Sequence, residues 1–88
     1  MPTIIARHKV GDINAWLKGH QDRVGLFTKA SSTFRTFQDV DNPNSVLLLI
    51  ETDDPGALAA FVNDPANDAI KATHTVIDPI TMATEVTL

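Results

Sequence analysis

The chain has 88 residues and no cysteine, and its eleven acidic and seven basic residues give a formal net charge of −4 at pH 7. These values predict one small domain. They argue against disulfides, thiolate metal sites and a nucleic-acid surface, which needs clustered basic residues with aromatic side chains. No apolar run approaches the roughly 20 residues that span a bilayer, and no secretory leader precedes the first strand, so we expect a cytoplasmic protein that does not enter a membrane.

The first half of the chain predicts a strand, a helix and a second strand. Residues 3–10 have strand character, and Gly11 breaks the pattern. Asp12 is a favourable N-cap for a helix that we expect to run to about Ala30. A second strand is predicted over residues 33–38.

The second half predicts a strand, a broken helix and a last strand. The turn-forming residues 39–44 precede a strand over residues 45–52, and their short length favours an antiparallel hairpin. An Asp-Pro pair begins a helix over residues 55–63, and a second such pair divides it from a piece over residues 65–74. Residues 80–88 alternate with period two and predict the final strand.

This βαββαβ order predicts a single α+β domain over residues 1–88 with the ferredoxin-like arrangement. Two right-handed crossovers place both helices on one face of a four-stranded antiparallel sheet whose central strands are the first and third. The third strand is apolar on both faces through residues 46–50. Because two helices cover only one face, we expect a second copy to cover the other, which makes a homodimer through the sheet.

Several short motifs resemble those of small dimeric α/β-barrel proteins related to the antibiotic-biosynthesis monooxygenase group. The segments that carry the resemblance are Ile5-Ala6-Arg7-His8-Lys9-Val10-x-Asp12, Trp16, Asp41-x-Pro43-Asn44, Glu51-x-Asp53-Asp54, Phe61 and Asp64-Pro65. The resemblance implies the same fold and a dimeric barrel. It also implies an activity among those of the group, which include cofactor-free oxygenation of aromatic polyketides, haem degradation and cyclase-like chemistry. Oxygenating and haem-cleaving members commonly place an asparagine on the first strand and a tryptophan elsewhere in the pocket, whereas this chain has His8 and Trp16.

His20 is the candidate catalytic residue that stands out in the sequence. On a helical wheel it falls in one apolar sector with Ile13, Leu17, Val24 and Phe27. A histidine that faces a helix–sheet cavity is suited to general acid–base catalysis, because its pKa lies near neutrality. The alternative is a histidine near the edge of the sheet that is hydrogen-bonded to backbone or water.

His8 is the second candidate acid or base, since it shares a face of the first strand with Ile4 and Ala6. Strand alternation does not say whether that face points toward the helices, so an exposed histidine at the strand end is the alternative. The candidate substrate-binding residues are Trp16, Arg23 and Phe27. Trp16 offers an aromatic wall and Arg23 a partner for an anion, although core filling and a surface ion pair are the simpler interpretations.

No metal or other cofactor is predicted, because the histidines lie on separate elements without ligand spacing and glycine-rich phosphate motifs are absent. We therefore expect a small-molecule enzyme of monooxygenase-like or cyclase-like character, acting on an aromatic or polyketide-like substrate in an apolar pocket between helices and sheet. The alternatives are a non-catalytic dimer that binds a small ligand, such as a stress-associated module, and a purely structural dimer.

Overall fold

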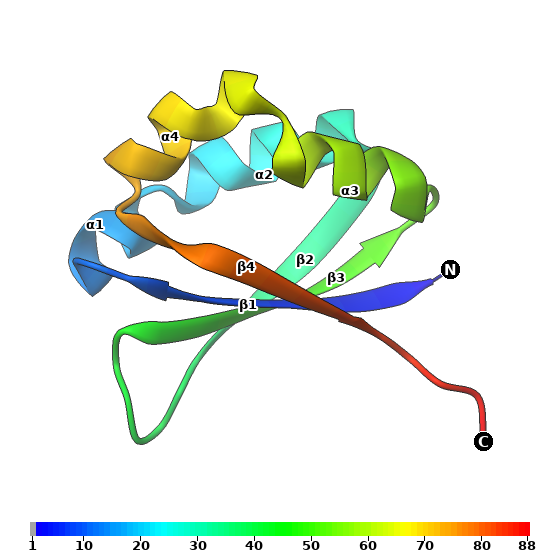
Figure 1. Cartoon of the computed structure of the whole chain (residues 1–88), viewed down its shortest axis with the longest axis horizontal. Helices are drawn as coiled ribbons and strands as arrows, with labels where there is room; N and C mark the ends of the chain where they lie inside the picture. Colours follow the sequence, from blue (N-terminus) through cyan, green and yellow to red (C-terminus); the bar gives the residue numbers. More distant parts are fainter. Residues whose placement is uncertain (1) are drawn as a thin grey trace.

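The computed structural model describes residues 2–88 and shows a four-stranded antiparallel sheet with all helices on one face (Figure 1). The strand order is β2-β3-β1-β4, which confirms the ferredoxin-like prediction with the first and third strands at the centre. The elements in chain order are β1 (Thr3–Val10), α1 (Ile13–Lys18), α2 (His20–Lys29), β2 (Ser32–Gln38), β3 (Ser45–Thr52), α3 (Pro55–Asn63), a 3₁₀ turn (Pro65–Asn67), α4 (Asp68–Thr73) and β4 (Val76–Thr84).

The two central strands form the floor of the core because their side chains alternate between the two faces. Every second residue of β1 and β3 is buried beneath the helices, and the residues between are half-buried or exposed. The cross-strand pair of His8 with Val46 lies on the buried face. Alternation alone does not say which face of β1 is inside. The structure shows that the face carrying Ile4, Ala6 and His8 points toward the helices.

The first helical segment ends and restarts at Gly19, whereas the sequence predicts one continuous helix. Asp12 caps α1 as expected, because its side chain accepts hydrogen bonds from the backbone N–H groups of Asn14 and Ala15. Gly19 then serves as the C-cap of α1 and precedes α2. A Cβ at this position would lie 2.6 Å from ring atoms of His74. Because Gly19 has no Cβ, the backbone at the break lies closer to the His74 ring than it could with any other residue at this position.

The prediction for the last strand was wrong in its position. β4 spans Val76–Thr84, so it begins before Pro79 and ends before the apolar residues Val86 and Leu88. Proline often marks a strand boundary, but β4 lies at the edge of the sheet, where an absent N–H is tolerated. The ladder to β1 also shifts its register at this point, between Arg7 and Lys9.

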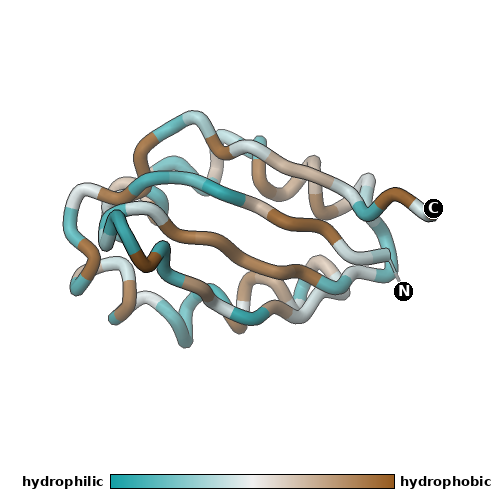
Figure 2. Tube along the Cα trace, turned by 90° about the horizontal axis from the view of Figure 1, so that it is seen from below, coloured by the Kyte–Doolittle hydropathy of each residue, from teal (hydrophilic) through white to brown (hydrophobic). Residues whose placement is uncertain are grey.

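Within residues 2–88, no helix covers the second face of the sheet. Figure 2 views this face and shows β3 hydrophobic along most of its length beside β1, which is hydrophobic near its N-terminal end and hydrophilic farther along. The apolar side chains there include Ile5, Phe37, Leu47 and Leu49, of which Ile5 and Phe37 are 38% and 39% exposed. This apolar surface is the feature from which the sequence predicts a partner subunit.

Two glycines in the helical region make a matched pair for a test of the packing at position 19. We expect Gly19→Ala to destabilise the fold by about 1–3 kcal/mol, because its methyl group forces His74 out of place. Gly25 lies inside α2, and apart from its chain neighbours and the backbone of its own helix, no atom of the described residues lies within 4 Å of the position that an added methyl group would take. Gly25→Ala should therefore stabilise the fold by about 0.5–1 kcal/mol. Urea unfolding of both variants measures these changes, and a neutral Gly19→Ala would contradict the close packing.

Candidate functional site

A small cavity of about 80 Å³ lies between the sheet and the helices. Its walls are mostly apolar, with contributions from β1, β3, α2, α3, α4 and β4. Six polar or amphipathic side chains also line it: His8, Trp16, Arg23, Asn67, Lys71 and His74. The lining therefore contains the cations Arg23 and Lys71 and contains no carboxylate among the residues that the structure describes.

Arg23 is buried in this wall, with 6% of its surface exposed. Its guanidinium carbon lies 4.0 Å from the centre of the Trp16 ring, a cation–π contact. Burial lowers the pKa of Arg23 to about 10, partly opposed by the nearby Asp22, so the side chain stays positively charged at neutral pH. Its Nε and Nη2 groups, and Nε1 of Trp16, have no hydrogen-bond partner within residues 2–88.

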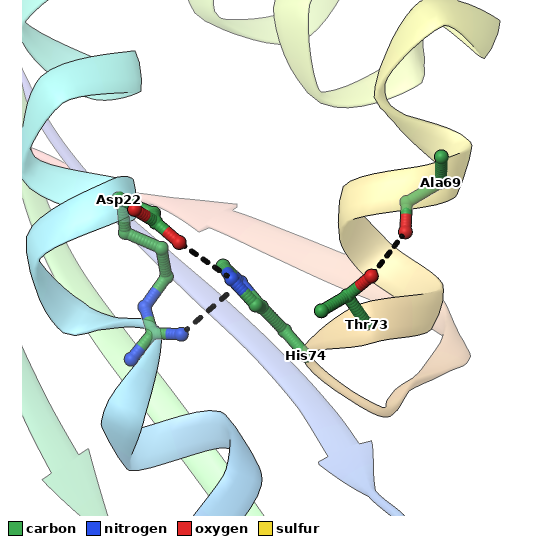
Figure 3. A network of polar contacts seen from close by, with 5 residues as sticks. Asp22, Ala69, Thr73 and His74 are labelled. Carbon is green, nitrogen blue, oxygen red and sulfur yellow. Dashed lines mark hydrogen bonds and ion pairs between the residues drawn. The ribbon is translucent and has the colours of Figure 1, made fainter.

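His74 connects the Arg23 side chain to the protein surface (Figure 3). Nη1 of Arg23 lies 3.5 Å from Nδ1 of His74, and Oδ2 of Asp22 lies 3.5 Å from Nε2 on the other side of the ring. Arginine only donates, so Nδ1 must accept and the proton of neutral His74 lies on Nε2, facing Asp22. Both nitrogens of the buried ring are thereby occupied, which leaves His74 as a positioning group for Arg23.

Among the ionisable side chains that line the cavity, His8 is the best arranged to accept a proton. Its Nδ1–H donates to the backbone oxygen of Lys9 at 2.9 Å, which leaves Nε2 as an unprotonated acceptor in the neutral ring. The ring packs edge-on against Trp16, with centroids 5.8 Å apart. Burial lowers the pKa of His8 below its ordinary value of 6.5, and the charge on Arg23 adds to this effect.

Four of the five sequence-predicted site residues, namely His8, Trp16, Arg23 and Phe27, line the cavity. His20 does not, and the prediction that it lies on the buried face of the helix was wrong. Its exposed ring packs instead against Phe34, with centroids 5.5 Å apart.

The physical reason is the phase of the buried stripe. Leu17 and Val24, which the wheel places in the predicted apolar sector, are 45% and 39% exposed, whereas the flanking Trp16 is fully buried. The indole has the largest apolar surface of this segment, and its burial rotates the helices so that Trp16, Arg23 and Phe27 line the cavity and Gly19 packs against His74. The glycine at this spacing was the available signal, because a small residue in a helix often marks close packing.

Sequence reasoning missed His74 as a site residue, because it follows a short helix far from Arg23 in the chain. Within residues 2–88, no group of three or more histidine, aspartate or glutamate side chains is arranged to hold a metal ion. The described helices are also all too short or too polar to cross a bilayer.

Comparison with solved structures confirms at the level of the fold the resemblance found in the sequence. A putative antibiotic biosynthesis monooxygenase from Bordetella bronchiseptica matches with a TM-score of 0.76 and 14% identity, over 99% of this chain and 96% of that one. SnoaB from Streptomyces nogalater, described as a cofactor-independent oxygenase, matches with a TM-score of 0.65 and 16% identity, over 99% and 94%.

An uncharacterized NIPSNAP domain protein from Burkholderia xenovorans matches with a TM-score of 0.68 and 20% identity, over 100% of this chain and 95% of that one. No family model matches the sequence, and the search of curated proteins gave no match. The chain therefore has the ferredoxin-like fold that antibiotic biosynthesis monooxygenases use.

The burial of His8 predicts a pH dependence of stability. The pKa of His8 is lower in the folded protein than in the unfolded chain, so the unfolded chain binds a proton at His8 more readily. The neutral ring therefore contributes its full stability above about pH 6.5, and this contribution is lost as the pH falls toward the folded-state pKa. We expect the melting temperature to drop between about pH 7.5 and pH 5, and the drop to be smaller in His8→Gln. Thermal melts across this range measure it, and equal drops in both proteins would contradict the assignment to His8.

Proposed function

We propose that the chain is a small-molecule enzyme of cofactor-free monooxygenase or cyclase type, with the cavity beside His8 and Arg23 as its active site. The observation that carries this proposal is the presence of a neutral base and a buried cation in one small apolar cavity. Such pairs suit reactions in which a substrate loses a proton and its anion must be stabilised. The shared fold with a cofactor-independent oxygenase supports the same class of chemistry.

In this proposal His8 is the general base. Its Nε2 takes a proton from an acidic O–H or C–H group of the substrate, while its Nδ1–H holds the ring against the Lys9 carbonyl. A pKa below 6.5 keeps the ring unprotonated, and therefore competent as a base, at neutral pH. His20 has no part in this proposal, because its ring lies on the outside of the helices.

Arg23 stabilises the anion that forms, and Trp16 and Phe27 supply aromatic walls for a planar substrate. The guanidinium offers charged donors in a small, mostly apolar cavity, where such donors are most effective. The volume of about 80 Å³ favours a substrate with at most one ring over a fused polyketide.

The open face of the sheet supports a homodimer of the dimeric α/β-barrel kind. Ile5, Phe37, Leu47 and Leu49 present an apolar surface, with Arg7, Arg35 and Glu51 among them. Pairing of two such faces removes the apolar groups from water and lets arginine and glutamate side chains interact across the two-fold axis. The cavity lies on the other side of the sheet, so each subunit carries its own site.

A non-catalytic ligand-binding dimer is the second candidate, favoured by the small size of the cavity. A binding module needs the cation and the apolar walls but has no need of a base. Loss of His8 therefore separates the two functions, because it removes turnover and leaves binding largely in place.

The catalytic role of His8 is tested with monocyclic phenols and enolisable acids, monitored by oxygen uptake and by product analysis. For any substrate turned over, His8→Gln should lower kcat by about 10²–10⁴, the usual contribution of a general base, with little effect on binding. His20→Gln is the matched control and should keep full activity, because its ring lies outside the cavity. An active His8→Gln variant would remove His8 from the mechanism.

The homodimer is tested by light scattering coupled to size exclusion. The parent protein should elute with twice the 9.5 kDa mass of one chain, and Leu49→Lys on the open face should elute at the single-chain mass. Leu17→Lys is the control, because Leu17 is exposed on α1 and lies away from the sheet face. A parent protein with the mass of one chain at micromolar concentration would disprove the dimer.

A further inference from the structure

We propose that the cavity recognises a compact carboxylate, whose two oxygens pair with Nε and Nη2 of Arg23 and whose short apolar tail fills the space against the sheet. The inference rests on the proposed function in that it concerns the same cavity and names its substrate class. Its test measures ligand binding alone, so the inference holds or fails independently of turnover.

The charge of the lining is the first argument. Arg23 and Lys71 contribute positive charge, and no described acidic side chain lines the cavity. Two acids act on the lining from outside it: Asp22 on Arg23 and Asp78 on His8. Asp22 points its carboxylate at His74, and its side chain is 74% exposed. The positive charge of the interior is therefore not neutralised from within, and an anion is the ligand that balances it.

The geometry of Arg23 is the second argument, because it specifies which anion. Nη1 faces His74, and one flat face of the guanidinium covers the Trp16 ring. The two groups without partners in the described part of the chain, Nε and Nη2, lie on the same edge of the planar guanidinium. Two parallel N–H groups on one edge match the two oxygens of a carboxylate, and because both nitrogens are closed off from solvent in this structure, the bidentate pair forms once the surrounding wall moves.

The size of the cavity limits the rest of the ligand. A cavity of about 150 Å³ holds benzene, and this one has about 80 Å³. Acids of two or three carbons are therefore closest to the space as the structure stands, and isobutyrate, which has as many non-hydrogen atoms as benzene, and benzoate enter after movements of the walls. Leu48, Ile50, Phe61 and Val62 supply the apolar contacts for such a tail.

The protein carries its own probe for this binding. Trp16 is the single tryptophan of a chain without tyrosine, and its ring lines the cavity, so the intrinsic fluorescence reports on the site alone. The probes are isobutyrate and benzoate, each compared with its neutral isostere, isobutyramide and benzamide. We expect saturable changes in emission, with each acid binding at least about tenfold more tightly than its amide.

Variants identify the partner of the carboxylate, and calorimetry measures them because removal of Arg23 also changes the fluorescence. Arg23→Met should bind the acids at least about tenfold more weakly and lose the preference over amides, whereas Arg23→Lys, without the bidentate edge, should recover only part of it. Lys29→Gln, at the exposed end of α2, removes one positive charge away from the cavity and from the open sheet face, so it is the control and should bind like the parent protein. Thermal melts of each variant verify that it folds.

The outcomes separate this inference from the proposed enzyme. Equal affinity of the parent protein for acid and amide, or an unchanged acid preference in Arg23→Met, overturns the carboxylate site. If Arg23→Met does not fold, the carboxylate site is judged by the acid–amide comparison in the parent protein and by the affinity of Arg23→Lys for the acids. A parent protein that prefers acids over amides but turns over none of the tested substrates, or a His8→Gln variant that keeps both this preference and full turnover, supports the binding site and rejects the catalytic role of His8.

Discussion

The stacking of the Arg23 guanidinium on the Trp16 indole is the contact around which the helical side of this protein is arranged. It brings α1 and α2 to the sheet with a charged group inside the core, and it sets the phase of both helices. A cation–π contact of this kind contributes about 0.5–2 kcal/mol, whereas each buried donor without a partner costs about 1–3 kcal/mol. Because Arg23 leaves two such donors, the stacking does not offset its burial, and the arrangement is costly for stability alone. Groups that are retained at such a cost usually serve a binding or catalytic role.

The overall fold was predictable because its signals are local. Asp12, Asp54 and Pro55 mark helix beginnings, and the alternation along β1 and β3 reflects a sheet with a core on one side. The edge strand was misplaced because the effect of a proline depends on whether a neighbouring strand needs its N–H. That information comes from the strand order and is absent from the strand itself.

The site was predictable only in part, because its members meet through tertiary contacts. The sequence placed Arg23 and Trp16 at the flank of the predicted buried stripe of the helix. In the structure they lie within the buried stripe, which is rotated about the helix axis from the predicted one by about one residue. His20 illustrates how an error in phase changes the role of a residue, since a rotation of about 100° takes a side chain from the core to solvent. His74 is 51 positions from Arg23 and has no pattern of its own in the sequence, so only the contact between the two side chains in the folded chain revealed it.

The close approach of His74 to Gly19 also bears on how a ligand reaches the enclosed site. None of the six residues of α4 is buried, and the buried ring of His74 at its C-terminal end packs against the break between α1 and α2. Besides this ring, the wall formed by α4 is held by a hydrogen bond from Lys71 Nζ to the Val62 carbonyl and by contacts with β4, whereas the opposite wall is a hydrogen-bonded sheet. Local opening requires the least free energy where the fewest buried contacts are broken, so the cavity has a preferred direction of entry, from the side of α4.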